Sequence, residues 1–448
     1  MLDINLFRVE KGGNPDLVRE SQRRRFADEG VVDEIIRLDE GWRKSRFEQD
    51  SCRRELNKLS KEVGLKKRAR EDASELIAQT VEVKKTIAEA EKITAELEQK
   101  RDALLRNLGN LVHESVPTSK NEDDNLVVRT WGEPALPNGP KKNHVDLLHM
   151  IDGVEYERGT SVAGNRGYFL KGFGVQLNLA LIHYGLNFLV QRGYTPIQTP
   201  YFMEKEAMAK VAQLEQFDEE LYTVGGLGVS EKYLIATSEQ PIAAYHVDDW
   251  VDPRTLPRKY VGYSTCFRKE AGSHGRDTLG IFRVHQFEKI EQFCLTSPED
   301  NESWNAHENM IKASEEFHQS LGIPYRVVSI VSGALNKAAA KKLDLEGWYP
   351  AGSAYRELVS CSNCTDYQSR RLQTRFGSNK RGDQGEKKFV HMLNSTLCAT
   401  TRVICAILEN NQTDEGVIIP EPLRAYMGGK ELMEFSRAPP NLRDPSKK

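Results

Sequence analysis

The sequence lacks the features of a secreted or disulfide-stabilised protein. Its seven cysteines are scattered over 448 residues, and only Cys361 and Cys364 lie close together. An odd number of dispersed thiols is typical of reduced cysteines in the cytosol rather than of a disulfide framework. The first residues, MLDINLFRVEKGG, have neither the apolar stretch of a secretory signal nor the composition of a transit peptide. We therefore expect a cytoplasmic protein.

The sequence also has no strong excess of charge and no long hydrophobic run. Its net charge is -3, from 63 basic and 66 acidic residues. This balance excludes a uniformly basic nucleic-acid binder but allows a local basic patch. No apolar run approaches the roughly 18 residues that suggest a membrane span, so we expect no membrane partner. The length of 448 residues favours two domains.

Two heptad-like series in the N-terminal third predict a pair of long helices, at 31–63 and 76–108. Between them, Gly64 is expected to end the first helix, and Asp72 or Ser74 to cap the second. Two such helices back to back predict an antiparallel coiled coil about 45–50 Å long. The expected seam positions are Ile35, Leu38, Trp42, Ser45, Gln49, Cys52, Leu56, Leu59 and Val63 in the first helix, and Leu76, Thr80, Val83, Ile87, Ala90, Thr94, Leu97, Arg101, Leu104 and Leu108 in the second.

The end of this hairpin is rich in basic residues. Six of them fall between Lys58 and Arg70, against the single acid Glu62. A basic tip on a rigid arm suits contact with a phosphate backbone, which supplies affinity without reading base sequence. The alternative is a solvated charge run with no partner. The six residues are Lys58, Lys61, Lys66, Lys67, Arg68 and Arg70.

The stretch 262–293 is expected to form two strands, 263–270 and 281–293, joined by a loop rich in glycine and charge. Because side chains alternate along a strand, one face would carry arginine, an aromatic ring and carboxylates. That set suits an extended ligand with anionic, planar and cationic parts; the alternative is a solvated face with a stray phenylalanine. The residues expected to share faces are Ser264, Cys266, Arg268 and Glu270 on the first strand, and Ile281, Arg283, His285, Phe287 and Glu291 on the second.

Three other stretches place polar residues beside buried elements. A helix over 174–192 precedes a short strand, TPIQTPYF; YLIATSEQPI predicts a strand that turns at 237–239 into a helix; and FVHML at 389–393 predicts a strand. After that strand, residues 394–396 are expected at a strand-to-helix turn, with Arg402 on an apolar helix where it needs an anionic or aromatic partner. The Ser238 and Glu239 pattern is equally typical of a capping box.

The CxxC formed by Cys361 and Cys364 is weak evidence for a metal. A structural zinc site needs four ligands, and no second pair has suitable spacing; His391 stands alone. We therefore expect no zinc.

Taken together, these stretches resemble class II aminoacyl-tRNA synthetases. FRKE followed by GIFRVHQFEKIEQF is similar to the second signature motif, and its wording is closest to seryl-tRNA synthetases of eukaryotic type. The helix, strand and proline near 174–200 resemble the first motif. CATTR resembles the third, although Thr401 stands where the common motif has glycine. That family also carries an N-terminal helical arm that grips tRNA.

The resemblance implies an α+β fold, with an antiparallel coiled-coil arm and a catalytic domain whose mostly antiparallel sheet is flanked by helices. We expect the arm at 1–115, a linker at 116–143, the catalytic domain at 144–436 and a flexible tail at 437–448. The implied enzyme is a homodimer. It activates L-serine with ATP and Mg²⁺, and then transfers the seryl group to the 3′ end of tRNA(Ser) and of tRNA(Sec).

The resemblance also implies residue roles. The catalytic residues would be Arg268, Glu291 and Arg402. The serine site would hold Thr237, Glu239, Arg268, Glu291, Asn394 and Thr396. The ATP site would hold Arg268, Lys269, Glu270, Arg283, Val284, His285, Gln286, Phe287, Glu357, Leu358, Val359, Ser360 and Arg402. Glu357 and Ser360 would bind Mg²⁺, which prefers oxygen ligands and bridges phosphates.

Two alternatives belong to other classes. A class II synthetase for another amino acid would keep Arg268 and Phe287 but differ around Glu291 and Thr237. A coiled-coil RNA-binding or scaffold protein with a retired catalytic domain should have lost residues that face ATP. Arg268, Arg283 and Arg402 are all present, which disfavours the second alternative.

Overall fold

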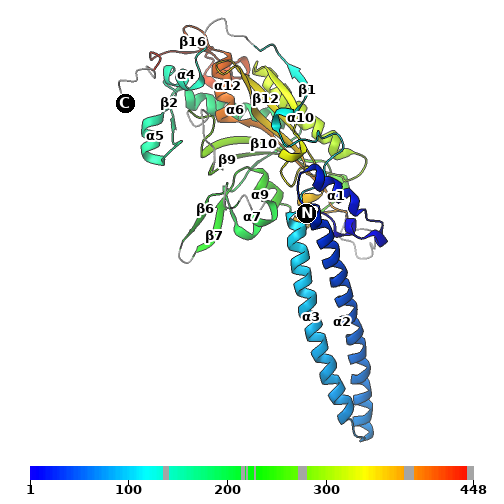
Figure 1. The fold of residues 1–448 in the computed structure, drawn as a ribbon. Helices are drawn as coiled ribbons and strands as arrows, with labels where there is room; N and C mark the ends of the chain where they lie inside the picture. The colour runs from blue at the N-terminus through cyan, green and yellow to red at the C-terminus, as the bar shows by residue number, and fades with distance from the viewer. Residues whose placement is uncertain are drawn as a thin grey trace, which may run out of the picture. The chain divides into compact units, whose positions relative to one another are not determined.

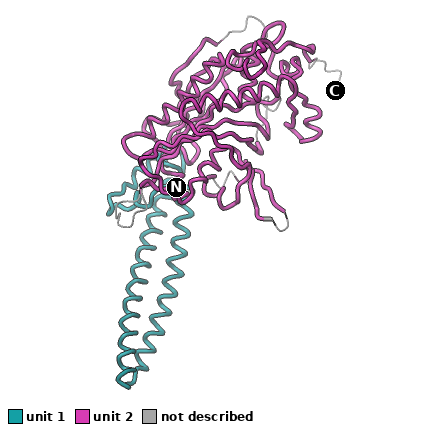
Figure 2. The backbone as a smooth tube through the Cα atoms, turned by 180° about the vertical axis from the view of Figure 1, so that it is seen from behind, with its two compact units in different colours: residues 1–111 teal, residues 112–448 magenta. Residues whose placement is uncertain are grey.

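The chain folds into two compact units, residues 1–111 and residues 112–448 (Figure 2). The structure is a computed structural model that describes residues 1–134, 141–212, 217, 220–226, 229–270, 280–377 and 388–440. The first unit is helical throughout, whereas the second contains all the β-strands among the described residues (Figure 1).

The first unit is dominated by an antiparallel helical hairpin. Helix α2 (Gly30–Ala69) and helix α3 (Ser74–Asn107) lie side by side along their whole length (Figure 1). Every predicted seam position is buried or half-buried, so the predicted coiled coil is confirmed. The short elements that precede it are the 3₁₀ turns η1 (Ile4–Phe7) and η2 (Val9–Lys11) and helix α1 (Pro15–Arg24).

Two polar residues in the seam bond to each other. The Ser45 and Thr94 hydroxyls lie 2.8 Å apart across the two helices, and Thr94 also donates to the Ala90 carbonyl at 2.7 Å. A buried hydroxyl without such a partner would be costly. Ser45 and Thr94 therefore keep their hydrogen bonds inside the seam, whereas the buried Gln49 Oε1 has no hydrogen-bond partner among the described residues.

The predicted helix end at Gly64 is wrong. Helix α2 continues through Gly64 to Ala69, and Arg70 ends it in the left-handed conformation, with φ 58°. One glycine costs about 1 kcal/mol in a helix interior, which the pairing of two long helices outweighs. The N-cap position of α3 is Ala73 and not Asp72 or Ser74. The Asp72 carboxylate, one residue earlier, accepts hydrogen bonds from the Ser74 backbone N–H and hydroxyl.

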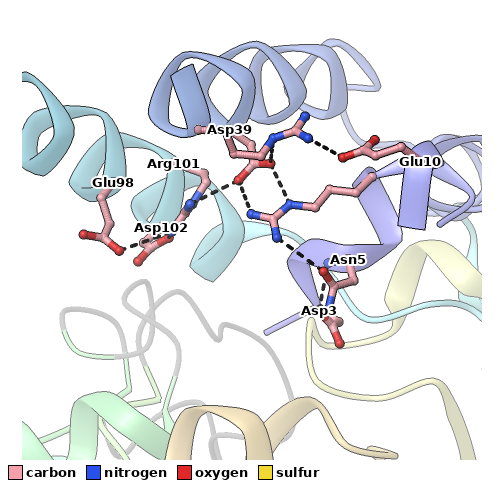
Figure 3. Close-up of polar contacts among 9 residues, drawn as sticks. Asp3, Asn5, Glu10, Asp39, Glu98, Arg101 and Asp102 are labelled. Atoms are coloured by element: carbon pink, nitrogen blue, oxygen red, sulfur yellow. Dashed lines mark hydrogen bonds and ion pairs between the residues drawn. The ribbon is translucent and has the colours of Figure 1, made fainter. Parts of the chain in front are cut away.

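A buried carboxylate joins the base of the hairpin to the N-terminal turns (Figure 3). Asp39 is 2% exposed and accepts two hydrogen bonds from the Arg8 guanidinium, at 2.8 and 2.7 Å. Arg101 of α3 and Arg43 of α2 also contact it, at 3.1 and 3.2 Å. Burial acts to raise the pKa of Asp39, but the bonds and charges of these arginines lower it. Asp39 therefore stays ionised and links three segments of the unit.

The second unit is built on an eight-stranded sheet of order β1-β11-β12-β13-β15-β10-β9-β4. All neighbouring pairs are antiparallel except β4 and β9, which are parallel. The predicted mostly antiparallel sheet is thus confirmed. The strand bounds are Leu126–Trp131 (β1), Thr195–Gln198 (β4), Arg258–Phe267 (β9), Gln286–Thr296 (β10), Tyr325–Ser329 (β11), Lys341–Tyr349 (β12), Ala354–Asn363 (β13) and His391–Ala399 (β15).

Three long helices cover the sheet and form its main core: α6 (Phe173–Val190), α10 (Glu302–Ser320) and α12 (Thr400–Asn410). The side chains of β10 that face α10 alternate with those that line the pocket described below. Gln292, for example, donates to the Met310 carbonyl of α10 at 3.1 Å. The sheet therefore has a covered face and a face that is available for chemistry.

Helix α6 qualifies the expectation of no membrane-length segment. It is the one helix in the described ranges whose length and mean hydropathy of 1.3 would suffice to cross a membrane. Half of it is buried, and Leu177, Leu181 and Leu189 are fully enclosed in the core of the second unit. This packing accounts for its apolar composition.

Smaller elements complete the second unit. The remaining strands are Val154–Glu155 (β2), Phe169–Leu170 (β3), Phe202–Glu204 (β5), Thr223–Gly226 (β6), Val229–Leu234 (β7), Trp250–Val251 (β8), Arg375–Phe376 (β14), Gly416–Ile418 (β16) and Leu432–Glu434 (β17). The remaining helices are His144–Met150 (α4), Tyr156–Ala163 (α5), Lys205–Val211 (α7), Glu239–Ala244 (α9), Tyr367–Leu372 (α11) and Glu421–Arg424 (α13).

The predicted linker, 116–143, contains ordered structure. Within it, Leu126–Trp131 forms β1, which pairs with β11 at the edge of the sheet. Its prolines and acidic residues suggested a connection, but Arg129 is held by Glu315 of α10 through two nitrogen–oxygen contacts of 2.9 and 2.6 Å. Residues 135–140 and most of the predicted tail, 441–448, lie outside the described residues.

We predict that Asp39→Asn destabilises the hairpin. The substitution leaves three arginines around a neutral group, and removing one partner of a buried ion pair costs about 3–5 kcal/mol. Hydrogen exchange of the α2 and α3 amides should report that the free energy of unfolding of the hairpin has fallen by that amount. Asp33→Asn is the matched control, because Asp33 is 67% exposed and pairs with Arg19 on the surface, where a pair is worth about 1 kcal/mol or less. Equal protection in both variants would contradict the role given to Asp39.

Candidate active site

The open face of the sheet holds a cavity of about 370 Å³. The elements around it are β10, β12, β13 and β15, together with the segment that follows β9 and the start of α9 and of α12. All but four of the residues predicted for the site line it: Thr237, Glu239, Arg268, Glu270, Arg283, Val284, Phe287, Glu291, Glu357, Leu358, Ser360, Asn394, Thr396 and Arg402.

Strand periodicity brings the polar residues of β10 and β15 to one face. On β10, Phe287, Lys289 and Glu291 are two residues apart and point the same way. On β15, Asn394 and Thr396 do the same. The predicted strand-to-helix turn at 394–396 is wrong, because β15 continues to Ala399 before α12 begins.

An irregularity in β13 brings Glu357 and Ser360 to the same cavity. Residues three apart on a regular strand point to opposite faces. Here Leu345 pairs with Val359 and Glu346 pairs with Glu357, so Leu358 is left without a partner on β12. This β-bulge turns both oxygen-bearing side chains toward the cavity.

One end of the cavity carries a hydrogen-bonded group centred on Glu291. Glu291 is 2% exposed, and Thr396 donates to its Oε2 at 3.1 Å. Lys289 Nζ lies 2.6 Å from the same oxygen and donates to the Thr237 hydroxyl at 2.8 Å. This end of the cavity therefore offers a carboxylate and hydroxyls in fixed positions, which suits a small polar ligand.

A second carboxylate lies behind this group. Glu239 Oε1 accepts hydrogen bonds from Gln368 at 2.7 Å and from Asn394 at 3.0 Å. Burial raises the pKa of Glu239 to about 6, and the nearby charge of Glu291 acts in the same direction. Asn394 is thus oriented by Glu239, which fixes the direction in which its own carbonyl oxygen points.

The other end of the cavity combines a ring with arginines. The Arg268 guanidinium carbon lies 5.4 Å from the centre of the Phe287 ring, and its Nε donates to the Ala236 carbonyl at 3.3 Å. Arg283 Nη1 lies 3.3 Å from Glu270 Oε2. A planar ring beside cationic groups suits a nucleotide, whose base can stack and whose phosphates need positive charge.

Arg402 of α12 contacts both an anionic group and an aromatic ring, the two kinds of partner expected for an arginine in an apolar helix. It donates to the Glu357 carbonyl at 3.0 Å and lies 3.6 Å from the Glu357 carboxylate. Its guanidinium carbon is 4.9 Å from the centre of the Phe282 ring. Loss of water around Glu357 acts to raise its pKa, but the charges of Arg402 and Lys342 lower it. The Glu357 carboxylate is therefore ionised and 46% exposed, as a cation ligand must be.

Four predicted residues do not line the cavity. The second strand begins at Gln286 and not at Ile281. The strand alternation of side chains that was expected for residues 281–285 therefore does not apply to them. His285 Nδ1 lies 3.0 Å from the backbone carbonyl oxygen of Arg268. His285 and Gln286 instead line a second cavity of about 360 Å³. Val359 is fully buried in the core, and Lys269 is placed by its backbone bond to Glu220. The loop 271–279 lies outside the described residues.

Some cavity residues were missed by sequence reasoning. Lys289 could have been found, because it lies midway between Phe287 and Glu291 on the same face of β10. Lys342 could also have been found, because it alternates with Asp344 and Glu346 in β12. Phe282 lies in the stretch 281–293 but was not expected on the polar face, and Asn336 comes from a segment with no polar pattern. Lys342 Nζ lies 3.0 Å from Asp344 Oδ2, and burial raises the pKa of Asp344 to about 7 despite the positive charge of Lys342.

The fold and the cavity define a class II aminoacyl-tRNA synthetase. Residues 222–411 match the family described as "tRNA synthetase class II core domain (G, H, P, S and T)". Residues 1–112 match a second family, "Seryl-tRNA synthetase N-terminal domain". The helical unit and the sheet-based unit thus each have a counterpart among known domains.

Full-length relatives identify the particular family. The chain is 60% identical to serine–tRNA ligase of Helianthus annuus, covering 97% of this chain and 99% of the relative. It is 58% identical to the cytoplasmic serine–tRNA ligase of Arabidopsis thaliana, covering 98% and 97%. The chain therefore belongs to the seryl-tRNA synthetase family, and it is of the cytoplasmic type named for such relatives.

Solved structures agree with this assignment. Cytoplasmic serine–tRNA ligase from Naegleria fowleri, in complex with AMP, is 51% identical and superposes with a TM-score of 0.90 over 98% of this chain and 99% of that chain. Seryl-tRNA synthetase from Pyrococcus horikoshii, complexed with ATP, is 41% identical with the same TM-score of 0.90, over 98% and 100%.

We predict that Glu239→Gln stabilises the protein at alkaline pH. Because the folded pKa of Glu239 is raised to about 6, its contribution to stability is complete below the unfolded pKa near 4.3 and is lost as the pH rises through about 6. The neutral glutamine still accepts from Gln368 and Asn394. The gain in unfolding free energy should be about 2 kcal/mol at pH 8 and about half of that at pH 5.

Thermal unfolding of both forms at pH 5 and pH 8 measures this difference. Glu231→Gln is the control, because Lys205 and Tyr233 lower the pKa of that exposed carboxyl, so the same gain at pH 8 is not expected. An equal gain in stability for Glu239→Gln at both pH values would refute the raised pKa that is assigned to Glu239.

Proposed function

We propose that the chain activates L-serine with ATP to form seryl-adenylate, and then transfers the seryl group to the 3′ end of tRNA(Ser). The observation that supports this most directly is the two-ended cavity. A carboxylate with fixed hydroxyls lies at one end and an aromatic ring with arginines lies at the other. Complexes of relatives with AMP and ATP support nucleotide binding in this fold.

Activation requires positioning more than acid–base catalysis. The serine carboxylate is already ionised at neutral pH, so its oxygen attacks the α-phosphorus without help from a base. A new oxygen–phosphorus bond forms, the bond to the bridging oxygen breaks, and pyrophosphate leaves with that electron pair. The protein holds the two reactants in line and stabilises the charge on the α-phosphate.

We assign the nucleotide contacts by the chemistry of each side chain. Arg268 holds the α-phosphate, where its planar fork can bond two oxygens. Phe287 stacks on the adenine, and Glu270 accepts from the adenine amino group. Arg283 and Arg402 hold the γ-phosphate end. The proximity of Arg268 to the Phe287 ring, 5.4 Å, supports placing base and α-phosphate side by side.

Six further residues are proposed to help hold the nucleotide without forming the centre of the site. Lys269, Val284 and Val359 would shape the backbone around it, as would Leu358 at the bulge. His285 and Gln286, which face the second cavity, would act only by fixing the path of β10.

Mg²⁺ is proposed to bind Glu357 and Ser360. The two residues fit the ion because they present a carboxylate and a hydroxyl, both hard oxygen donors, to one cavity. In the described ranges no group of three or more His, Cys, Asp or Glu side chains is placed to hold a metal, so phosphate oxygens would complete the coordination. When bound, the ion would neutralise phosphate charge.

The serine pocket is proposed to bind the substrate through Glu291, Thr237, Asn394 and Thr396, with Glu239 behind them. Glu291 would bind the ammonium or hydroxyl group of serine. A site built to bond a hydroxyl rejects analogues that lack it by roughly 10⁴-fold. Threonine would be excluded by its extra methyl group.

The helical unit is proposed to bind tRNA. The six basic residues near the end of α2 are all exposed, as phosphate contact requires. We extend the proposal to tRNA(Sec), which shares the need for a seryl group. We also propose that the functional domains are 1–115 and 144–436, joined through 116–143 and followed by a tail at 437–448.

Homodimerisation is proposed to involve α6 and the strand that follows it. Val175, Leu179 and Val190 of α6 are 39–47% exposed although the other side of the helix is core. Phe169 nearby is 48% exposed. A second copy of the chain would cover these apolar side chains.

We predict that Glu291→Ala lowers serine-dependent ATP–pyrophosphate exchange by about 100-fold, because it removes a charged hydrogen-bond partner from a buried site. The KM for ATP should change little. Glu288→Gln is the matched control: Glu288 is three residues away, and it bonds to Tyr263 at 2.6 Å rather than to the cavity. Normal ATP–pyrophosphate exchange in Glu291→Ala would contradict the serine-binding role that is assigned to Glu291.

We predict that replacing the six basic tip residues by serine weakens tRNA charging but not amino-acid activation. Loss of phosphate contacts should raise the KM for tRNA by about 10-fold or more near physiological salt and flatten its salt dependence. Exchange without tRNA should match that of the unchanged protein. An unaltered KM for tRNA would show that the charge run is only solvated.

A further inference from the structure

Lys289 lies at the centre of the serine end of the cavity, yet the mechanism above gives it no task. Its side chain is 6% exposed, and its Nζ bridges Glu291 and Thr237 at 2.6 and 2.8 Å. A buried ammonium persists only where its charge and its donors are matched. Both partners of Lys289 are residues proposed to touch the amino acid.

The two oxygens of Glu291 are used differently. Oε2 is contacted by Lys289 and by the Thr396 hydroxyl. In the described part of the chain, no donor contacts Oε1. The carboxylate is therefore held by one oxygen and presents the other as an acceptor.

The Thr237 hydroxyl offers a hydrogen-bond donor, whereas Glu291 offers an acceptor. Lysine has donors only, so Thr237 Oγ1 accepts from Lys289 at 2.8 Å, and it also accepts from the Glu239 backbone N–H at 3.3 Å. With two bonds accepted, the remaining capacity of the hydroxyl is to donate. Lys289 thus leaves the site with one fixed acceptor, Glu291, and one fixed donor, Thr237.

We propose that Lys289 is a positioning residue that sets this acceptor–donor pair and thereby selects an amino acid whose side chain can both donate and accept, that is, a hydroxyl. The inference rests on the proposed serine-binding function and concerns how that function is made specific. Lys289 acts through Glu291 and Thr237 and makes no contact of its own with the reacting atoms.

The charge of Lys289 has a second consequence, through Glu239. Several groups face that carboxyl: Glu291 and Lys289 from β10, Arg268 after β9, Gln368 from α11 and Asn394 from β15. Burial raises the pKa of Glu239 to about 6, and Lys289 opposes that rise. Without Lys289 the pKa of Glu239 would rise further.

The test compares Lys289→Met and Lys289→Arg with the unchanged protein in ATP–pyrophosphate exchange, using serine and alanine as substrates. For Lys289→Met we expect the KM for serine to rise by about 10-fold or more, the KM for ATP to stay within about twofold, and the preference for serine over alanine to shrink. Lys289→Arg should restore part of that preference. The acidic limb of kcat/KM for serine should move to higher pH in Lys289→Met.

Lys205→Met is the matched control, because Lys205 also pairs with a glutamate, Glu231 at 2.7 Å, but on the surface. An equal rise in both KM values, or an unchanged preference for serine over alanine, would overturn the proposal. Absence of serine-dependent exchange in the unchanged protein would instead refute the proposed function.

If Lys289→Met does not fold, Thr237→Val and Thr237→Ser carry the test. Thr237→Ser keeps the donor that Lys289 orients and should keep the preference for serine. Thr237→Val removes it and should lose the preference by a similar factor. Equal preference in the two variants would refute the acceptor–donor account.

Discussion

Charge that is taken out of water must be paired, and this constraint organises the catalytic cavity. Each carboxylate proposed to touch a ligand lies beside a cation: Glu291 beside Lys289, Glu270 beside Arg283, and Glu357 beside Arg402. Such pairs let the free protein keep ionised groups in a partly enclosed space. A bound phosphate can then replace the carboxylate partner of an arginine, so nucleotide binding exchanges contacts instead of creating uncompensated charge.

The same constraint acts in the helical unit, with a different outcome. There the buried carboxylate Asp39 is fully surrounded by arginines, which fixes the base of the hairpin. Toward the far end the seam is half-buried and the surface is basic. An exposed basic end on a rigid hairpin suits the phosphate-backbone contact that is proposed for this unit.

Periodic features of the sequence predicted the fold well, and local irregularities limited the prediction of the site. Every seam position that heptad spacing predicted in α2 and α3 is buried or half-buried, although the buried Val32, Asp39 and Leu105 were not predicted. Alternation placed Phe287 and Glu291 on one face. The β-bulge at Leu358 could not be foreseen, since it depends on cross-strand pairing rather than on local sequence. For the same reason Asn394 and Thr396 were expected in a turn, although β15 is extended by pairing with β10. Gly64 suggested a helix end, but tertiary pairing of the two helices outweighed its propensity.

The central claim is that one cavity joins ATP to serine and to no other amino acid. The most direct measurement is ATP–pyrophosphate exchange with each of the twenty amino acids in turn, without tRNA. The account predicts exchange with serine alone, since only serine combines the small volume and the hydroxyl that the Glu291 end of the cavity requires. Exchange that is strongest with another amino acid, or absent with all of them, would contradict it.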